Sequence, residues 1–194
     1  MKLPISSPIK PTITGTYGFT SPEQVAWYKA RGLNMTSHNG VDFAIGSPEL
    51  TYGTKLVAPR DCELSQTWWD TPLSTKGNGI QISWENEADR FNVRFWHCSE
   101  IIVKPSYKEG DIIGYIGNSG LCNPAPTDTR PFDGSHLHLM VYKNGVIIDP
   151  LTIFNKEEWY LSSDTSTEED LPPLFRVVKY MTELVKNLLL TLKK

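Results

Sequence analysis

Two of the four histidines in this sequence form the motif His136-Leu137-His138, which stands in a run of alternating polar and apolar residues. Residues two apart on a β-strand point to the same face, so His136 and His138 project together. Leu137 and Leu139 then point to the opposite face and can enter a core. Two imidazoles side by side on a strand suit a metal site, although an isolated motif of this kind is weak evidence.

A second motif, Ser37-His38-Asn39-Gly40-Val41-Asp42, places a histidine four residues before an aspartate, with a glycine that permits a sharp turn between them. Asp42 falls on the polar side of an alternating run that starts near Val41. Imidazole nitrogen and carboxylate oxygen are both ligands that zinc accepts. Taken alone, the pair is better explained by a hydrogen bond between His38 and Asp42 at a turn.

The combination of the two motifs is more specific than either one. His38, Asp42 and His138 supply three ligands, and a catalytic zinc takes three protein ligands and leaves its fourth position to water or substrate. His97 and His136 then remain for proton transfer or for stabilising a transition state. His97 ends the β-like run that includes Trp96, and by itself it could equally be a histidine packed among aromatic rings.

The elements that must position these residues are mostly strands. Short runs rich in β-branched residues or alternating in polarity recur between Val41 and Pro150, and Gly, Pro, Asn or Asp separates them. Asn144-Gly145 predicts a tight hairpin turn. Ser21 as N-cap, Pro22 at the first helical position and Gln24 three residues after the cap predict one short surface helix, of about ten residues. The fold class expected is mainly β, with antiparallel pairing.

Composition and charge exclude several classes of function. The chain has 194 residues, 39% hydrophobic and 21% charged, and a net charge of -3, which gives no support for a nucleic-acid partner. Three cysteines in no metal or redox spacing predict reduced, structural thiols. Prolines interrupt the apolar residues near the N-terminus, so no signal peptide is expected there.

Several spaced motifs, in order, resemble the lysostaphin-type, or LytM-type, zinc metalloendopeptidases, which hydrolyse peptidoglycan. The resemblance spans roughly residues 14–150. It includes further segments outside the histidine motifs, namely Gly53-Thr54-Lys55-Leu56-Val57-Ala58-Pro59, Lys76-Gly77-Asn78-Gly79, Glu109-Gly110-Asp111-Ile112-Ile113-Gly114, Asn118-Ser119-Gly120 and Asp149-Pro150. It implies the fold of that family, an antiparallel sheet or sandwich described as a duplicated hybrid motif. The sequence departs from the family pattern at Phe95, Cys98, Leu139 and Met140, and its loop from Leu121 to Asp133 is longer than usual.

The resemblance also implies a role for each of the five polar residues. His38, Asp42 and His138 correspond to the family's zinc ligands, and His97 and His136 to its catalytic histidines. The implied activity is hydrolysis of peptide cross-links in bacterial peptidoglycan, with stem or cross-bridge peptides as partners. The alternative is a non-catalytic, degenerate module of the same fold that binds wall peptides or a protein partner.

The C-terminal part of the chain has a different composition. Residues 1–160 are expected to form the peptidase domain, residues 161–173 an acidic linker, and residues 174–194 an amphipathic, basic helix. That helix either packs on this domain or on a second copy of the chain, or it lies on a membrane surface. With no signal peptide expected, the enzyme would be made in the cytoplasm and reach the wall by lysis, injection or non-standard export, as a phage or prophage lysin or tail-associated hydrolase would.

Overall fold

The computed structural model describes residues 1–71 and 75–161 of the chain. Met1–Leu161 form one compact unit. Most of the predicted acidic linker and the whole predicted C-terminal helix, residues 162–194, lie outside the described residues. Among the residues described, no helix combines the length and apolar composition that a membrane crossing requires.

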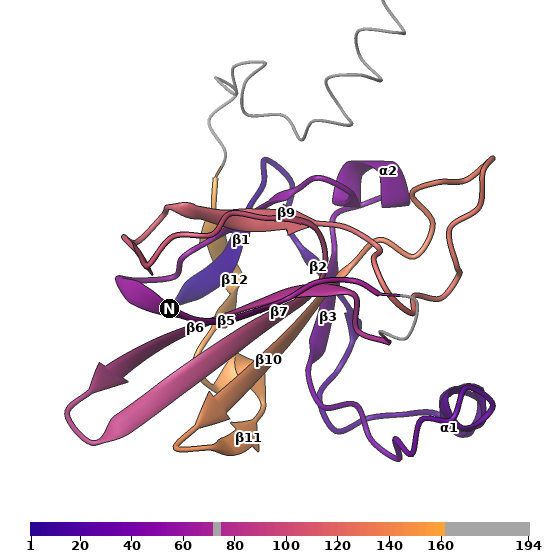
Figure 1. Cartoon of the computed structure of the whole chain (residues 1–194), viewed down its shortest axis with the longest axis horizontal. Helices are drawn as coiled ribbons and strands as arrows, with labels where there is room; N and C mark the ends of the chain where they lie inside the picture. The colour runs from indigo at the N-terminus through magenta and orange to yellow at the C-terminus, as the bar shows by residue number, and fades with distance from the viewer. Residues whose placement is uncertain (72–74, 162–194) are drawn as a thin grey trace, which may run out of the picture. The chain divides into compact units, whose positions relative to one another are not determined.

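Within the described ranges, twelve strands form a single sheet (Figure 1), which confirms the mainly β prediction. Eight strands follow one path, in the order β12 (Asn155–Tyr160), β1 (Lys2–Ser6), β4 (Lys55–Val57), β9 (Ile112–Ile116), β7 (Asp89–Ile101), β10 (Leu137–Lys143), β3 (Val41–Ala44) and β2 (Thr12–Gly15). Off this path, β6 (Asn78–Asn86) joins β7 to β5 (Cys62–Trp68), β8 (Ser106–Tyr107) pairs with β5, and β11 (Val146–Ile148) pairs with β10. All of these pairs are antiparallel except β1 with β12.

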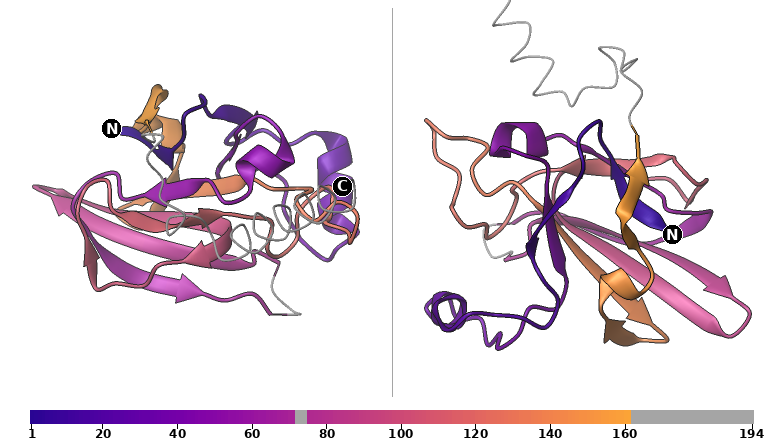
Figure 2. Two further views of the ribbon diagram at one scale, coloured as in Figure 1. Left: turned by 90° about the horizontal axis from the view of Figure 1, so that it is seen from above. Right: turned by 180° about the vertical axis from the view of Figure 1, so that it is seen from behind.

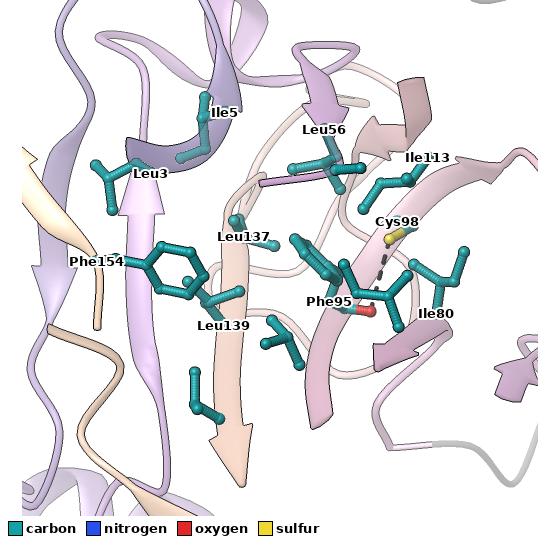
Figure 3. Packing of buried hydrophobic residues seen from close by; sticks show 14 of the residues in the cluster. Leu3, Ile5, Leu56, Ile80, Phe95, Cys98, Ile113, Leu137, Leu139 and Phe154 are labelled. Carbon is teal, nitrogen blue, oxygen red and sulfur yellow. Dashed lines mark hydrogen bonds between the residues drawn. The ribbon is translucent and has the colours of Figure 1, made fainter. Parts of the chain in front are cut away.

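The core collects the apolar face of each strand. On β10, Leu137, Leu139 and Val141 are fully buried, as their alternation with the two histidines predicts. Figure 3 shows side chains from β1, β4, β7, β9 and β10 pointing toward one another, with Phe95 near the centre of the group. The opposite face of β3, β7 and β10 is left to carry polar residues.

The three cysteines are buried and unpaired, in agreement with the predicted structural thiols. Figure 3 marks the contact of the Cys98 thiol with the carbonyl oxygen of Phe95, 3.7 Å away. Burial raises the pKa of each of the three thiols to about 12, so none is a nucleophile at neutral pH.

The predicted surface helix is present as α1 (Pro22–Lys29). The Ser21 hydroxyl accepts a hydrogen bond from the backbone N–H of Gln24, at 3.2 Å, as its N-cap role predicts. The helix ends at Ala30 and so is shorter than expected. It buries none of its residues, and Figures 1 and 2 show it standing away from the sheet in the connection between β2 and β3.

Four strands and two short helices were not predicted from the sequence. They are β1, β2, β8, β12, α2 (Pro48–Thr51) and the 3-10 helix η1 (Pro150–Thr152). In β1, Leu3, Pro4 and Ile5 are all buried, so the strand has no alternation to recognise. The predicted hairpin at Asn144-Gly145 is confirmed, because both residues adopt positive φ, 51° and 81°, between β10 and β11.

Candidate metal centre and active site

Strand pairing brings the two histidine motifs together. Asp42 on β3 lies directly opposite His138 on β10, and His38 sits in the turn just before β3. Gly40 makes this approach feasible, because a Cβ there would lie 2.5 Å from the carbonyl oxygen of Leu139 and 2.8 Å from His138 Cε1. A one-residue slip in register would turn Asp42 into the core, so the buried Val41 and Phe43 on either side fix its position.

The three predicted ligands converge on one point. His138 Nδ1 lies 2.7 Å from Asp42 Oδ1 and 3.0 Å from His38 Nε2, and His38 Nε2 lies 3.3 Å from Asp42 Oδ1. One nitrogen or oxygen ligand atom from each of these residues lies within 4.8 Å of the other two. Ligands at zinc distances of about 2.0–2.2 Å in a tetrahedron stand roughly 3.3 Å apart, so the separations suit such an ion with modest expansion.

Hydrogen bonds to oxygen acceptors decide which ring nitrogen of each ligand carries its proton. The other nitrogen of His38, Nδ1, faces the carbonyl oxygen of Thr16 at 3.1 Å. The other nitrogen of His138, Nε2, faces Oδ1 of Asn39 at 3.2 Å. Because these oxygens only accept, each imidazole donates there and keeps a lone pair toward the shared point. Such outer partners are typical of metal-binding histidines.

The chemistry of this donor set suits a metal cation. Two imidazole nitrogens and a carboxylate oxygen meet within 3.3 Å, and such atoms repel one another unless a proton or a metal ion lies between them. Burial alone would raise the pKa of Asp42, but the hydrogen-bonding imidazoles of His138 and His38 outweigh burial and hold the pKa below its usual range. Asp42 is therefore ionised at neutral pH and available as a ligand.

His97 reaches the site from a β-bulge. Trp96 pairs with His138 on β10, while Cys98 already pairs with Ile116 on β9, so β7 changes partner at His97. His97 has φ of 64°, a left-handed conformation uncommon outside glycine. The sequence predicts that the strand ends at His97, but β7 continues to Ile101. Bulges of this kind are common beside active sites, where they redirect a side chain.

His97 and His136 face each other at the metal centre, with ring centroids 4.5 Å apart. The Nδ1 of His97 donates to the carbonyl oxygen of Ser119 at 2.8 Å, and the Nδ1 of His136 donates to that of Gly134 at 2.7 Å. In the neutral form of each ring, the lone pair therefore lies on Nε2. Burial lowers the pKa of His97 to about 3, and the neighbouring His136 and His138 act in the same direction. His97 is thus a neutral base at physiological pH.

A cleft of about 390 Å³ opens over these residues. The apolar wall comes from α1 and the segment after it, with Trp27, Tyr28, Leu33 and Met35. The opposite wall comes from Thr75, Lys76 and the loop Leu121–Pro124. Figures 1 and 2 show α1 and this loop projecting on the same side of the molecule. An extended molecule lying between them would cross the candidate metal site.

The structure brings together all five side chains singled out from the sequence, and their roles in binding and catalysis remain predictions. Sequence reasoning missed the oxygen acceptors that orient the rings, namely Thr16, Asn39, Ser119 and Gly134. Asn39 stands next to His38, and Ser119 belongs to the Asn-Ser-Gly motif, so both lie in motifs that the sequence singles out, but neither was assigned a role. Thr16 and Gly134 act through their backbone carbonyls, which any residue type supplies.

Comparisons with known proteins agree with this geometry. The profile of Peptidase family M23 matches residues 36–150. The solved structure of LytU is 28% identical, has a TM-score of 0.50, and covers 72% of this chain and 81% of its own. The catalytic domain of the antimicrobial peptidase lysostaphin from Staphylococcus simulans is 23% identical, with a TM-score of 0.50, covering 74% of this chain and 90% of its own.

A curated relative from Haemophilus influenzae, described as an uncharacterized metalloprotease, is 25% identical over 118 residues, or 60% of this chain. The chain spans about one fifth of that relative's length, because the match covers 21% of it. The family match covers more than half of the chain and contains all five residues of the candidate site. This chain belongs to Peptidase family M23, the lysostaphin-type peptidases.

Proposed function

We propose that the chain is a zinc-dependent endopeptidase that hydrolyses peptide cross-links of bacterial peptidoglycan. The observation that carries the proposal is the convergence of His38, Asp42 and His138 on one point, with two further imidazoles on the open side of the site. Two imidazoles and one carboxylate are a ligand set that catalytic zinc accepts, and the resemblance to the lysostaphin-type zinc peptidases favours zinc among the metals that imidazole binds. When bound, zinc would polarise the scissile carbonyl and acidify a water molecule.

The residues of this chain account for the remaining chemistry. The neutral His97, oriented by the Ser119 carbonyl, can accept a proton from the attacking water through Nε2. His136, oriented by the Gly134 carbonyl, presents its Nε2 on the same side, 3.9 Å from Asp42 Oδ1. It is placed to interact with the developing oxyanion or to return the proton to the leaving amine. The cleft holds the peptide and limits the access of bulk water.

Digestion of purified peptidoglycan tests this proposal. The zinc-loaded protein should release cross-link fragments detectable by mass spectrometry, and a chelator should stop their release. His38→Ala should lose both zinc binding and activity. His97→Gln should keep zinc binding but lose activity by roughly 100-fold or more, as expected for a general base.

The alternative of a non-catalytic module of the same fold makes the opposite prediction. It would bind wall peptides, while zinc-saturated protein left every muropeptide intact. All five polar positions are present in one site, which favours catalysis, since the loss of one ligand would be enough to remove it. If the protein binds one zinc ion per chain and still cleaves no peptidoglycan of any chemotype, the non-catalytic module is the correct alternative.

The route to the wall is a separate proposal that depends on the sequence alone. We propose delivery by lysis or injection, as in a phage or prophage lysin, and association of the C-terminal segment with a membrane surface or with a second copy of the chain. Liposome binding and sedimentation of the full chain, each compared with a fragment that ends at Leu161, would test the second part. Unchanged behaviour in both assays would contradict it.

A further inference from the structure

The metal centre shares one face of the sheet with a row of aromatic residues. Trp96 on β7 is the direct cross-strand partner of His138, which is the partner of Asp42. On the other side, Trp96 pairs with Gly79 of β6, and Gly79 pairs with Trp68 of β5. Directly paired residues point to the same face of a sheet, so the two tryptophans continue the row that begins at the metal site.

Gly79 lets the two rings meet. A Cβ at Gly79 would lie 2.3 Å from a ring carbon of Trp96, so the indole lies across β6 where a side chain would otherwise stand. The ring centroids of Trp68 and Trp96 are 4.6 Å apart. The two rings, tilted by 42° to each other, form an aromatic shelf beside His97 that extends away from the metal centre.

Two cations lie on this shelf. The Lys76 Nζ lies 5.1 Å from the ring centroid of Trp96, and the Arg94 guanidinium lies 5.3 Å from that of Trp68 and 4.4 Å from that of Tyr142. Arg94 also donates to Gln81 Oε1 at 2.6 Å and to the Tyr142 hydroxyl at 3.1 Å, both neutral acceptors. Rings and neutral acceptors orient these two side chains without neutralising them.

The described residues supply neither Lys76 nor Arg94 with a carboxylate partner within ion-pair distance. Asp70, close to Trp68 in sequence, accepts a hydrogen bond from the backbone N–H of Gly120. Both cations are half-buried, and burial followed by the charge of Arg94 lowers the pKa of Lys76. A half-buried pair of like charges is costly unless an anion joins it.

The position of Lys76 connects this pair to the reaction. Lys76 lines the cleft, and its carbonyl oxygen accepts a hydrogen bond of 3.4 Å from the backbone N–H of His97. One molecule bound in the cleft can therefore place an anionic group at Lys76 and a peptide bond at the metal site. On the α1 side the cleft is lined by residues such as Trp27 and Leu33, and Arg31, a cation at this wall, stacks on Trp27 without lining the cleft.

We propose that Lys76 and Arg94 form a subsite that binds a carboxylate of the substrate peptide close to the scissile bond. This rests on the proposed function and narrows its substrate class. Direct cross-links between stem peptides carry free carboxylates near the bond that is cut, whereas a polyglycine bridge has no charged group to offer. The subsite thus selects stem-to-stem links over glycine bridges, and Arg94 acts as the second, outer cation.

Calorimetric titration with single, uncleavable stem peptides tests the subsite. The two peptides are identical except that one carries a carboxylate and the other a carboxamide at the same position. The zinc-loaded wild-type protein should bind the carboxylate form about tenfold more tightly, or about 1.4 kcal/mol. Lys76→Met should abolish this preference, Arg94→Gln should reduce it, and Lys76→Arg should preserve it. Lys104→Met removes an exposed lysine outside the cleft lining and should change nothing.

Equal affinity of the wild-type protein for the two peptides would overturn the proposed subsite. The same conclusion would follow if Lys76→Met lowered the affinity for both peptides by the same factor while its thermal unfolding stayed unchanged. The binding assay does not depend on catalysis, so it can contradict the proposed subsite without contradicting the proposed function, and the digestion assay can do the reverse. A protein that prefers the carboxylate peptide but cuts no wall contradicts the proposed function. A protein that cuts glycine bridges and shows no preference contradicts the subsite alone.

Discussion

All four imidazoles of the site follow one rule at the residue scale. Each has one ring nitrogen facing an oxygen that can only accept, so its other nitrogen is left as a lone pair. For three rings the acceptor is a backbone carbonyl, and for His138 it is the side chain of Asn39. The acceptors therefore determine which nitrogen atom each ring offers to the site.

Asn39 is the acceptor that mutation can remove. Asn39→Ala leaves Nε2 of His138 without its partner at 3.2 Å, so the ring loses the bond that fixes its tautomer and orientation. We expect zinc affinity to fall by roughly 10- to 100-fold, as is typical for partners of metal ligands. Competition with a chromogenic chelator measures it, with the exposed Asn34→Ala as the matched control. Equal affinity in both variants would show that Asn39 does not orient the ligand.

His97 gives the protein a predictable response to acid. The pKa of His97 is about 3 in the folded protein and 6.5 in the unfolded chain. Between these pH values the unfolded chain therefore binds a proton at His97 that the folded chain does not bind. Stability is therefore lost as pH falls from about 6.5 toward 3, by up to about 1.4 kcal/mol per pH unit from this residue. Urea unfolding at several pH values should show a shallower loss for His97→Gln. A parallel pH dependence in both proteins would refute this.

The residue types at the site were predictable because metal chemistry restricts them. His38, Asp42 and His138 carry ligand atoms that few residues offer, and their spacing on strands is visible in the sequence. The acceptors at Thr16 and Gly134 were not predictable, because every residue has a carbonyl and only the folded backbone aims it. The same holds for the proposed carboxylate subsite, since Lys76 and Arg94 are brought near each other by the rings of Trp96 and Trp68, whose pairing across β6 the sequence does not give.

At the scale of elements, the close approach of the turn before β3 to β10 is the most demanding contact of the metal centre. Gly40→Ala would place a Cβ 2.5 Å from the Leu139 carbonyl oxygen, which is backbone and cannot move without breaking the β3–β10 pairing. We expect a stability loss on the order of 1–3 kcal/mol and a large loss of zinc affinity. Thermal unfolding and chelator competition measure the two effects.

Gly110→Ala is the control for this prediction. Gly110 has φ of 86°, and a Cβ added there would meet nothing within 4 Å, so the substitution strains the backbone without touching the metal centre. It should cost stability but leave zinc affinity intact. A Gly40→Ala variant with wild-type affinity would show that the turn before β3 tolerates displacement.

The alternation of apolar and polar residues predicted the strands that carry the site, but it did not predict β1 and β12, which pair the two ends of the folded unit. The sequences of β3, β7 and β10 alternate apolar core residues with mostly polar ones and so were predictable, although His138 and Met140 on the second face of β10 are also buried. Strand β12 is mostly exposed and charged, and β1 is buried without alternation. Their parallel pairing joins the two ends of the unit, a long-range contact that local sequence patterns do not encode.

At the scale of the whole molecule, zinc binding should be coupled to folding. The three ligands come from β3, the turn before it and β10, so unfolding separates them and the unfolded chain holds zinc poorly. At free zinc 1,000-fold above Kd, the gain is about 4.1 kcal/mol, or roughly 10 °C in Tm for a domain of this size. Thermal scans with zinc and with chelator measure it. His38→Ala should abolish the difference, and an equal shift in that variant would exclude this site as the cause.

The limits of the folded unit give a final prediction, because the family match ends at residue 150 while the compact unit continues to Leu161. The extra segment completes the core, since Phe154 is 2% exposed and Trp159 packs against the same cluster. It also joins the two ends of the unit, through the Met1 amino group on the Ile153 carbonyl and Trp159 Nε1 on the Ser7 carbonyl, at 2.9 and 3.0 Å.

A fragment of residues 1–161 should therefore unfold cooperatively, with a Tm close to that of the full chain. A fragment of residues 1–150 loses Phe154 and strand β12, so its unfolding free energy should fall by about 3–5 kcal/mol from the aromatic side chain alone. Phe154→Ala in the longer fragment should reproduce most of that loss, which separates the effect of core packing from that of strand pairing. Circular dichroism during heating gives all three values. Equal Tm values for the two fragments would place the true boundary at residue 150 and make β12 an appendage of the peptidase.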